Sequence, residues 1–184
     1  PQPREDLSRQ WTVLPATVGL TEFYGGGHRS DVVLAPSTPS VMPAKVGNYE
    51  LVERLGGGGM GDVYKARHSQ FGRQRAVKVI RSHFVEAGHR EVIRRFYQEI
   101  KAVGALEHPN IVVAIDSSTP ADTVHYLVME YLDGVGVDEL VARNGPLDVA
   151  DACEIVRQAA RGLAYIHQHG MVHRDIKPSN PMLT

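Results

Sequence analysis

The stretch LGGGGMGDVYKA, residues 55–66, contains five glycines and one register of the pattern G-x-G-x-x-G, formed by Gly56, Gly58 and Gly61. Glycines let a backbone approach phosphate groups closely and present amide N–H groups without a Cβ in the way. A P-loop would need Lys and then Ser or Thr after the last glycine, but Asp62 and Val63 stand there. A Rossmann loop would open a helix, whereas DVYKARH continues as a strand pattern. The stretch therefore predicts a strand-loop-strand flap for a nucleotide, and a merely flexible hairpin is the alternative.

Segments rich in β-forming residues surround this loop and predict an antiparallel meander of five strands. They are YELVERL (49–55), GDVYKARH (61–68), QRAVKVI (74–80), HPNIVVAID (108–116) and TVHYLVMEYL (123–132). In the third segment Ala76, Lys78 and Ile80 share one face, because side chains alternate along a strand. A lysine between two apolar neighbours on one face is expected to have a specific partner.

Residues 88–105 change to helical spacing, with an apolar stripe of Ile93, Phe96, Ile100 and Val103. Glu99 lies beside this stripe, and a carboxylate at the edge of a buried face requires a cation. Lys78 is a candidate for that cation, and a solvated Glu99 is the alternative.

Residues 148–169 form the longest helical pattern, and Asp148 and Gly170 are suitable residues for its two ends. Its expected apolar face consists of Val149, Ala152, Val156, Ala159, Leu163 and Ile166. Few other segments are available to cover this face, so we expect self-association through this helix.

The composition limits the classes of function. The 184 residues carry a net charge of -1, with 42% hydrophobic and 22% charged residues, which is typical of a soluble globular protein. Such a charge does not favour nucleic acid or anionic lipid, and no apolar run reaches membrane-helix length. The single cysteine, Cys153, makes an internal disulfide impossible and predicts a cytoplasmic location, or the cytoplasmic side of a membrane if an anchor follows.

Residues 1–47 carry several prolines and no sustained apolar period, so we predict a mostly disordered extension. Trp11, Val13, Leu14 and Phe23 leave a short docking segment as the alternative. Three histidines, His167, His169 and His173, do not share a face that would favour a zinc site.

Several motifs occur in a fixed order: LGGGGMGDVYKA, RAVK (75–78), Glu99 in a helix, HPNIV, VMEYLDG and HRDIKPSN (173–180). Together they resemble the protein kinase family, and more narrowly the bacterial serine/threonine kinases of the eukaryotic type. The resemblance covers residues 49–184. It implies an α+β fold with a five-stranded antiparallel small lobe and one helix in residues 48–132. The first helices of an incomplete large lobe would occupy residues 133–184, ending in the catalytic loop.

The resemblance implies that ATP and Mg²⁺ are the cofactors and that a protein with a Ser or Thr acceptor is the substrate. Lys78 would hold the α and β phosphates while paired to Glu99, Asp175 would accept the proton of the substrate hydroxyl, and Lys177 would neutralise charge on the transferring group. Asn180 would bind magnesium. The nucleotide site would consist of Leu55, Gly56, Gly58, Gly61, Val63, Ala76, Lys78, Met129, Glu130, Tyr131, Leu132 and Met182.

Two features depart from the family pattern. Position 181 usually carries a branched apolar residue, and here Pro181 removes a backbone donor and turns Asn180 towards extended angles. The sequence also reaches Thr184 without a DFG triplet or an activation loop. We therefore expect an N-terminal piece of a kinase domain with no useful activity alone. The alternative is a non-catalytic, kinase-like nucleotide-binding or scaffold protein.

Overall fold

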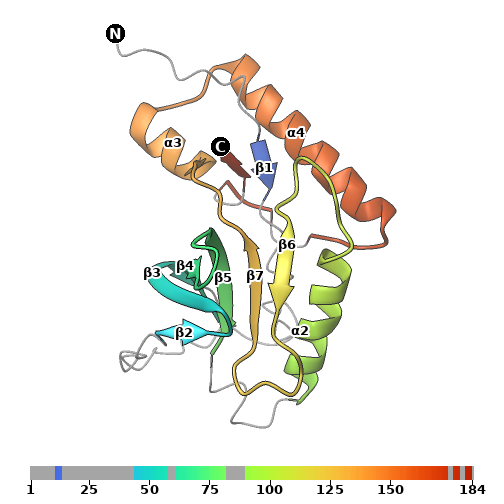
Figure 1. Cartoon of the computed structure of the whole chain (residues 1–184). Coiled ribbons are helices and arrows are strands. Elements are labelled where there is room, and N and C mark those ends of the chain that lie inside the picture. Colours follow the sequence, from blue (N-terminus) through green and yellow to red (C-terminus); the bar gives the residue numbers. More distant parts are fainter. Residues whose placement is uncertain are drawn as a thin grey trace, which may run out of the picture.

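The computed structural model describes residues 11–13, 44–57, 61–81, 90–173, 176–178 and 181–183. Its main feature is a six-stranded antiparallel sheet with the order β2-β3-β4-β5-β7-β6. The strands are β2 (Lys45–Val46), β3 (Tyr49–Gly57), β4 (Gly61–His68), β5 (Gln74–Ile80), β6 (Ala114–Ser117) and β7 (Tyr126–Glu130). Figure 1 shows this sheet on one side of the molecule and the helices α3 and α4 on the other.

The predicted five strands are present, and the short strand β2 extends the sheet at the β3 edge. Strands β4 and β5 have the predicted boundaries. The fourth predicted strand is shorter than expected, because the residues from His108 to Val113 form a turn and a connection before β6 begins at Ala114. The backbone N–H of Ile111 donates to the carbonyl of His108 in that turn at 3.0 Å.

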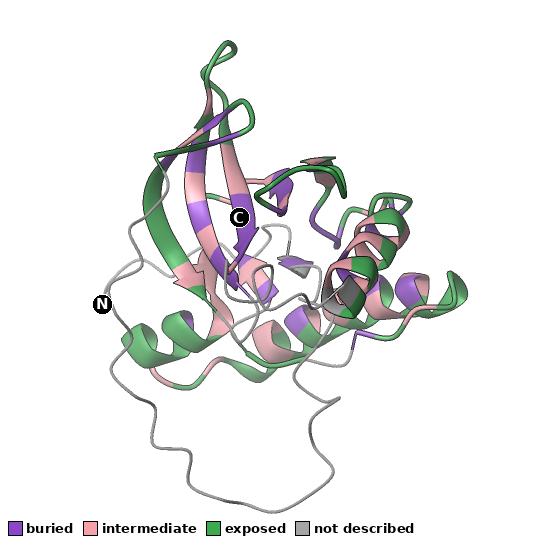
Figure 2. Ribbon diagram, turned by 90° about the horizontal axis from the view of Figure 1, so that it is seen from below, coloured by how far each residue is buried: buried purple, intermediate pink, exposed green. Residues whose placement is uncertain are grey.

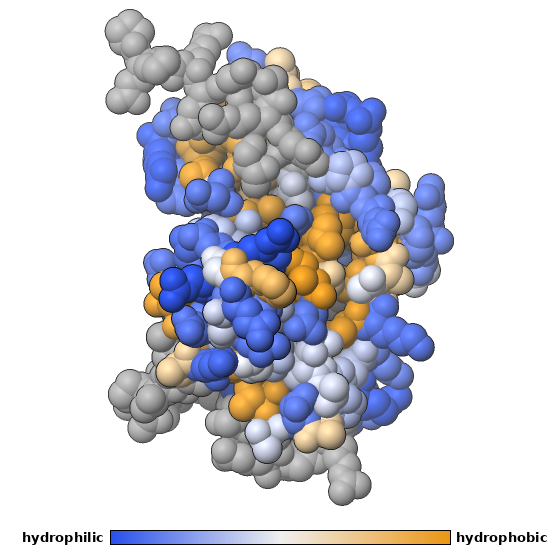
Figure 3. All heavy atoms as spheres, in the orientation of Figure 1, coloured by the Kyte–Doolittle hydropathy of each residue, from blue (hydrophilic) through white to orange (hydrophobic). Residues whose placement is uncertain are grey.

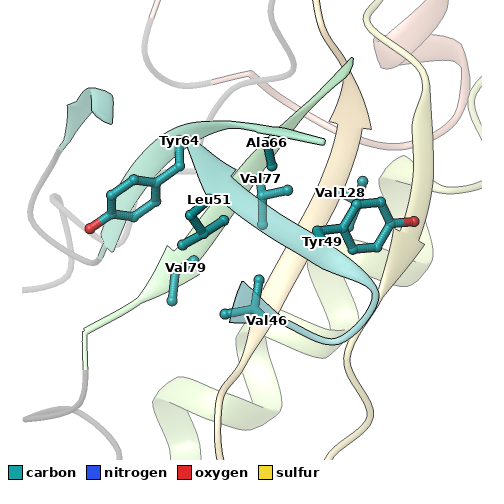
Figure 4. Close-up of a cluster of buried hydrophobic side chains, with 8 residues drawn as sticks. All are labelled: Val46, Tyr49, Leu51, Tyr64, Ala66, Val77, Val79 and Val128. Atoms are coloured by element: carbon teal, nitrogen blue, oxygen red, sulfur yellow. The ribbon is translucent and has the colours of Figure 1, made fainter. Parts of the chain in front are cut away.

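One face of the sheet holds the first hydrophobic core. Figure 4 shows its eight buried side chains, which converge from β2, β3, β4, β5 and β7. They are Val46, Tyr49, Leu51, Tyr64, Ala66, Val77, Val79 and Val128. Burial of these apolar side chains away from water is the main source of stability for a sheet of this size.

The opposite face packs against helix α2 (Arg90–Val103). Phe96 of α2 is buried among Ile80, Val112, Leu127 and Met129, while Ile100 contacts the same cluster. The predicted stripe is thus confirmed, since Phe96 and Val103 are buried and Ile93 and Ile100 half-buried. Figure 2 shows how buried residues follow the strands and one side of each helix.

The second half of the chain forms β8 (Val135–Gly136), α3 (Val137–Asn144) and α4 (Val149–Gln168). Asp148 caps α4, because its side chain accepts a hydrogen bond from the backbone N–H of Ala150 at 2.9 Å. Gly170 follows the helix with a φ of 73°, a left-handed conformation that favours glycine. Both predicted helix ends are therefore confirmed.

The buried face of α4 agrees with the predicted one only in part. Ile166, which was predicted, is buried against Leu106 and Ile111, and Ala152, Ala159 and Leu163 are half-buried. Ile155, which was not predicted, packs against Leu140 and Leu183. Val149 and Val156, by contrast, are 77% and 66% exposed. Apolar residues occupy more than one side of this helix, so the core covers one side and leaves the other at the surface.

A small antiparallel sheet with the order β1-β9-β8 joins distant parts of the chain. It pairs β1 (Trp11–Val13) with β9 (Pro181–Leu183), and Thr12 lies opposite Met182 in the register. Figure 1 shows these two strands side by side next to α4. Residues 11–13 are thus an ordered strand within the region for which composition predicted mostly disorder. Pro181 is the first residue of β9, a position where a strand tolerates proline.

Candidate nucleotide site

Lys78 occupies the centre of the sheet face that packs against α2. Its neighbours across the strands are Val63 of β4 and Leu127 of β7, and Ala76 pairs with Met129 one step along. Antiparallel partners direct their side chains to the same side of a sheet. Lys78, Val63, Ala76 and Met129 therefore gather on one surface, as the sequence predicts for a nucleotide site.

The charge of Lys78 is desolvated. The residue is 9% exposed, and burial lowers the pKa of its ammonium from 10.5 to about 8, while the carboxylate of Glu99 acts in the opposite direction. Glu99 is half-buried on α2, and its carboxylate acts electrostatically on Lys78. Their pairing in the nucleotide site stays a prediction.

The described parts of the glycine stretch lie at the end of β3 and the start of β4, with Gly56 opposite Val63 and Gly57 opposite Asp62. Position 61 requires glycine, because an ideal Cβ there would lie 2.2 Å from the carbonyl oxygen of Val79. At Gly56 a Cβ would meet nothing within 4 Å, so packing inside the chain does not require glycine at this position. The open space at Gly56, near the sheet face that carries the buried Lys78, would allow a phosphate-bearing ligand to approach the backbone closely. Gly58 lies outside the described residues.

Asp62, near the start of β4, accepts hydrogen bonds from two arginines, a feature that sequence reasoning missed. Arg54 of β3 donates to its Oδ1 at 2.7 and 3.2 Å, and Arg81 donates to both carboxylate oxygens at 3.1 and 3.2 Å. The hydrogen bonds from Arg81 and then Arg54 keep the pKa of Asp62 below its usual range, against the effect of burial. This cluster joins β3, β4 and the end of β5 next to the glycine stretch.

The segment after β7 contains the predicted hinge residues Glu130, Tyr131 and Leu132, which are all half-buried. Glu130 is fastened to Val113, because its backbone N–H donates to the Val113 carbonyl at 3.0 Å and its carboxylate accepts from the Val113 N–H at 3.1 Å. The Nζ of Lys65 lies 4.5 Å from the centroid of the Tyr131 ring, a cation–π contact between the flap strand and this segment. Leu55, at the start of the flap, is 45% exposed.

The predicted catalytic loop is described only in part. His173 is 3% exposed, Lys177 is exposed, and the carbonyl of Pro178 accepts a hydrogen bond from the N–H of Asp138 at 3.3 Å. Asp175 and Asn180 lie outside the described residues, so their roles stay predictions. Met182 is half-buried in β9, between Thr12 and Gly136.

Within the part of the chain that the structure describes, no group of three His, Cys, Asp or Glu side chains could hold a metal ion. Among the three histidines, the ring of His169 packs against Tyr165 at 4.3 Å between centroids and contacts its carbonyl. None of the described helices is both long and apolar enough to cross a membrane.

Comparison with known proteins decides the family. The model of the protein kinase domain matches residues 49–184. The chain belongs to the protein kinase family. The six-stranded sheet that holds Lys78 and the helix α2 that holds Glu99 thus belong to a kinase small lobe.

Similar proteins include serine/threonine kinases. The chain is 40% identical over 137 residues to the serine/threonine-protein kinase PrkC of Bacillus subtilis, covering 74% of this chain and 21% of that protein. It is 40% identical over 151 residues to PknB of Mycobacterium tuberculosis, covering 80% of this chain and 23% of PknB. The chain therefore spans about a fifth of the length of these relatives.

A solved structure agrees with the kinase fold. The kinase domain of M. tuberculosis PknI superimposes with a TM-score of 0.62 at 34% identity, covering 74% of this chain and 54% of the PknI domain. The α+β prediction of an antiparallel small lobe followed by the first helices of a large lobe is thereby confirmed.

Proposed function

We propose that the protein that contains this chain transfers the γ-phosphoryl group of ATP to serine or threonine hydroxyls of protein substrates. Residues 49–132 would supply the nucleotide site, and residues 173–180 the catalytic loop. The observation that carries the proposal is the buried Lys78, which lies on the face between sheet and helix with Glu99 as its electrostatic partner. A buried ammonium that keeps an acidic neighbour is suited to bind an anionic ligand that replaces lost hydration.

The residues fit ATP and magnesium in distinct ways. Phosphates would meet the Lys78 ammonium and the backbone of the glycine stretch, where Gly56 leaves open space. Adenine would lie against the apolar surface of Val63, Ala76 and Met129, which the strand register puts together. When bound, Mg²⁺ neutralises charge on the phosphates, and Asn180 is the residue proposed to hold it.

The acceptor preference rests on the catalytic loop. Lys177 lies two residues after Asp175, a spacing typical of serine/threonine kinases. Asp175 would accept the proton of the substrate hydroxyl, while Lys177 would neutralise charge on the phosphoryl group as it moves. The relatives named above are themselves serine/threonine kinases.

The test is phosphate transfer to matched peptides by the full-length protein. Three peptides that differ only in a Ser, Thr or Tyr acceptor are incubated with Mg²⁺ and labelled ATP, with Asp175→Asn as the matched variant. We expect labelling of the Ser and Thr peptides, and a loss of about a hundredfold or more in the variant. Labelling of the Tyr peptide alone, or equal rates in both proteins, would contradict the proposal.

Residues 1–184 taken alone are expected to bind nucleotide without useful turnover. Multiple turnovers by this polypeptide that fall on Asp175→Asn would refute that expectation. Nucleotide binding by the full-length protein without any transfer would favour the non-catalytic scaffold function.

We also propose self-association of this chain through the exposed side of α4. Val149 and Val156 are 77% and 66% exposed on that helix, and Cys153 between them is exposed too. Figure 3 shows further apolar surface between the sheet and the helices. Light scattering should detect oligomers that Val156→Lys disrupts, and a monodisperse wild-type monomer would contradict this.

The location is proposed to be the cytoplasm or the cytoplasmic face of a membrane.

A further inference from the structure

The hydroxyl of Tyr97 joins helix α2 to the segment between β6 and β7. It lies 2.6 Å from the carbonyl oxygen of Thr119, 2.8 Å from Oγ of Ser118 and 2.8 Å from Nδ1 of His125. Ser118 and His125 are 3% and 2% exposed, so their contacts with Tyr97 are partly shielded from water, whereas Thr119 lies at the surface. We call this group, Tyr97 with Ser118, Thr119 and His125, the Tyr97 latch.

The directions of these hydrogen bonds follow from the atoms. A carbonyl only accepts, so Tyr97 donates its single hydroxyl proton to Thr119. Its oxygen must then accept from His125, which requires a proton on Nδ1 of that ring. Oγ of Ser118 already accepts from the N–H of Tyr126 at 2.9 Å. The latch is therefore a connected network in which each hydrogen bond depends on its neighbours.

The latch reaches the strand that carries Lys78. The carbonyl of His125 accepts from the backbone N–H of Ile80 at 2.9 Å, and Ile80 is two residues beyond Lys78 on β5. On the helix side, Tyr97 is two residues before Glu99. His125 thus connects the element that holds Glu99 with the element that holds Lys78, through its ring at one end and its backbone at the other.

We propose that Tyr97 is a positioning residue for the nucleotide site, whose hydroxyl fastens α2 to the segment 118–125 and so keeps Glu99 beside Lys78. This inference rests on the proposed function, because it assigns Tyr97 to the same site. Phe96 and Ile100 hold α2 to the sheet by apolar contact, which is not directional. The latch supplies the directional contact that fixes how α2 is rotated and shifted along the sheet.

The alternative is that the Tyr97 hydroxyl only satisfies buried polar groups. It would then stabilise the whole lobe equally and would not hold α2 in particular. Hydrogen exchange of the nucleotide-free chain distinguishes the two roles. The variant is Tyr97→Phe, and the matched control is Tyr49→Phe, which also deletes a bonded hydroxyl. Tyr49 donates to Oδ2 of Asp116 at 3.0 Å and belongs to the core on the other face of the sheet.

We expect the amides of Arg90–Val103 to exchange roughly tenfold faster in Tyr97→Phe, with those of β5 and β7 unchanged. Tyr49→Phe should leave α2 at the wild-type rate. His125→Asn, which retains an N–H donor, should raise α2 exchange less than His125→Ala does. Unchanged α2 exchange in Tyr97→Phe, or an equal rise across helix and sheet, would overturn the proposal.

A second measurement links the latch to the site. The affinity for a magnesium complex of a non-hydrolysable ATP analogue is measured in the wild type, Tyr97→Phe, Glu99→Gln and the double variant. Tyr97→Phe should weaken binding about fivefold or more alone and leave it unchanged when Glu99→Gln is already present. An equal loss in both backgrounds would overturn the link to Glu99. If the wild type does not bind the analogue, the proposed function fails, while the exchange result still decides whether the latch holds α2.

Discussion

The buried charge of Lys78 should make the stability of the chain depend on pH in a defined direction. The pKa of this ammonium falls from 10.5 to about 8 on folding, and a change of one in pKa corresponds to about 1.4 kcal/mol. Keeping Lys78 protonated in the folded state at neutral pH therefore lowers the free energy of unfolding by about 3 kcal/mol. Burial sets this cost, and the attraction of Glu99 only reduces it.

The sign follows from proton binding. Between the folded and the unfolded pKa of Lys78, the unfolded chain binds the proton and the folded chain releases it. The free energy of unfolding should therefore rise with pH, by about 2 kcal/mol from about pH 7.5 to about pH 9.5. Below the folded pKa the contribution is constant, because both states carry the proton.

Other groups titrate as well, so the measurement needs a matched reference. The pKa of Tyr49, for example, is raised to about 12 by burial and by its bond to Asp116. The reference is the double variant Lys78→Met/Glu99→Gln, which removes both charges and leaves no unpaired carboxylate. Urea denaturation of both proteins is followed by circular dichroism across this pH range, and the difference in unfolding free energy is plotted against pH.

A difference that rises with pH by about this amount confirms that Lys78 is buried with its charge poorly compensated. Parallel curves would refute the reasoning, because they would mean that Lys78 remains hydrated. A difference that falls with pH would show that the attraction of Glu99 outweighs burial.

Three further changes test the site and its support. Asp62→Asn should lower the free energy of unfolding by about 1 to 2 kcal/mol, a modest loss because the arginine partners of Asp62 are 55% and 38% exposed. The control Glu50→Gln, in an exposed ion pair on β3 and β4, should lower it far less. Equal losses would contradict the role of Asp62. Gly61→Ala should destabilise by about 1 to 3 kcal/mol, because its Cβ would meet the Val79 carbonyl, and a wild-type denaturation midpoint would show that the strands yield. Asp148→Ala should lower the free energy of unfolding by about 1 kcal/mol through loss of the α4 cap, and no change would mean that another group caps the helix.

The sequence predicted the features that depend on short-range patterns. Strands β4 and β5 follow from alternation between glycine-containing turns, and the ends of α4 follow from Asp148 and Gly170. Lys78 could be predicted as a special residue because it lies between Ala76 and Ile80 on one face. Glu99 is a candidate partner because it lies beside the apolar stripe of α2, and the resemblance to kinases favours the same pairing.

Features that depend on how distant segments meet could not be predicted. Asp62 meets Arg54 across the β3–β4 pairing, which contains two register irregularities, and meets Arg81 across the β4–β5 pairing. Tyr97 and His125 are 28 residues apart and belong to different elements. The pairing of β1 with β9 likewise joins residues far apart in the chain. The composition of either segment alone gives only a weak indication of a strand and none of its partner.

The buried face of α4 was predicted only in part for a related reason. Ile166 of the predicted face is buried, but Val149 and Val156, which fit the same helical period, are exposed, and the buried Ile155 lies outside the predicted face. Periodicity shows that a helix has apolar residues, but the neighbours decide which of them are covered, and here Leu140, Ile111 and Leu183 cover the isoleucines.

Calorimetric titration of residues 1–184 with the magnesium complex of a non-hydrolysable ATP analogue tests the claim that Lys78 lies in a nucleotide site. We expect saturable binding at one site per chain that weakens about tenfold or more in Lys78→Met/Glu99→Gln. The loss cannot be attributed to unfolding if the variant is at least as stable as the wild type at neutral pH, as the removal of a buried charge predicts. Equal affinity in both proteins, or no binding by a folded wild type, would contradict the claim.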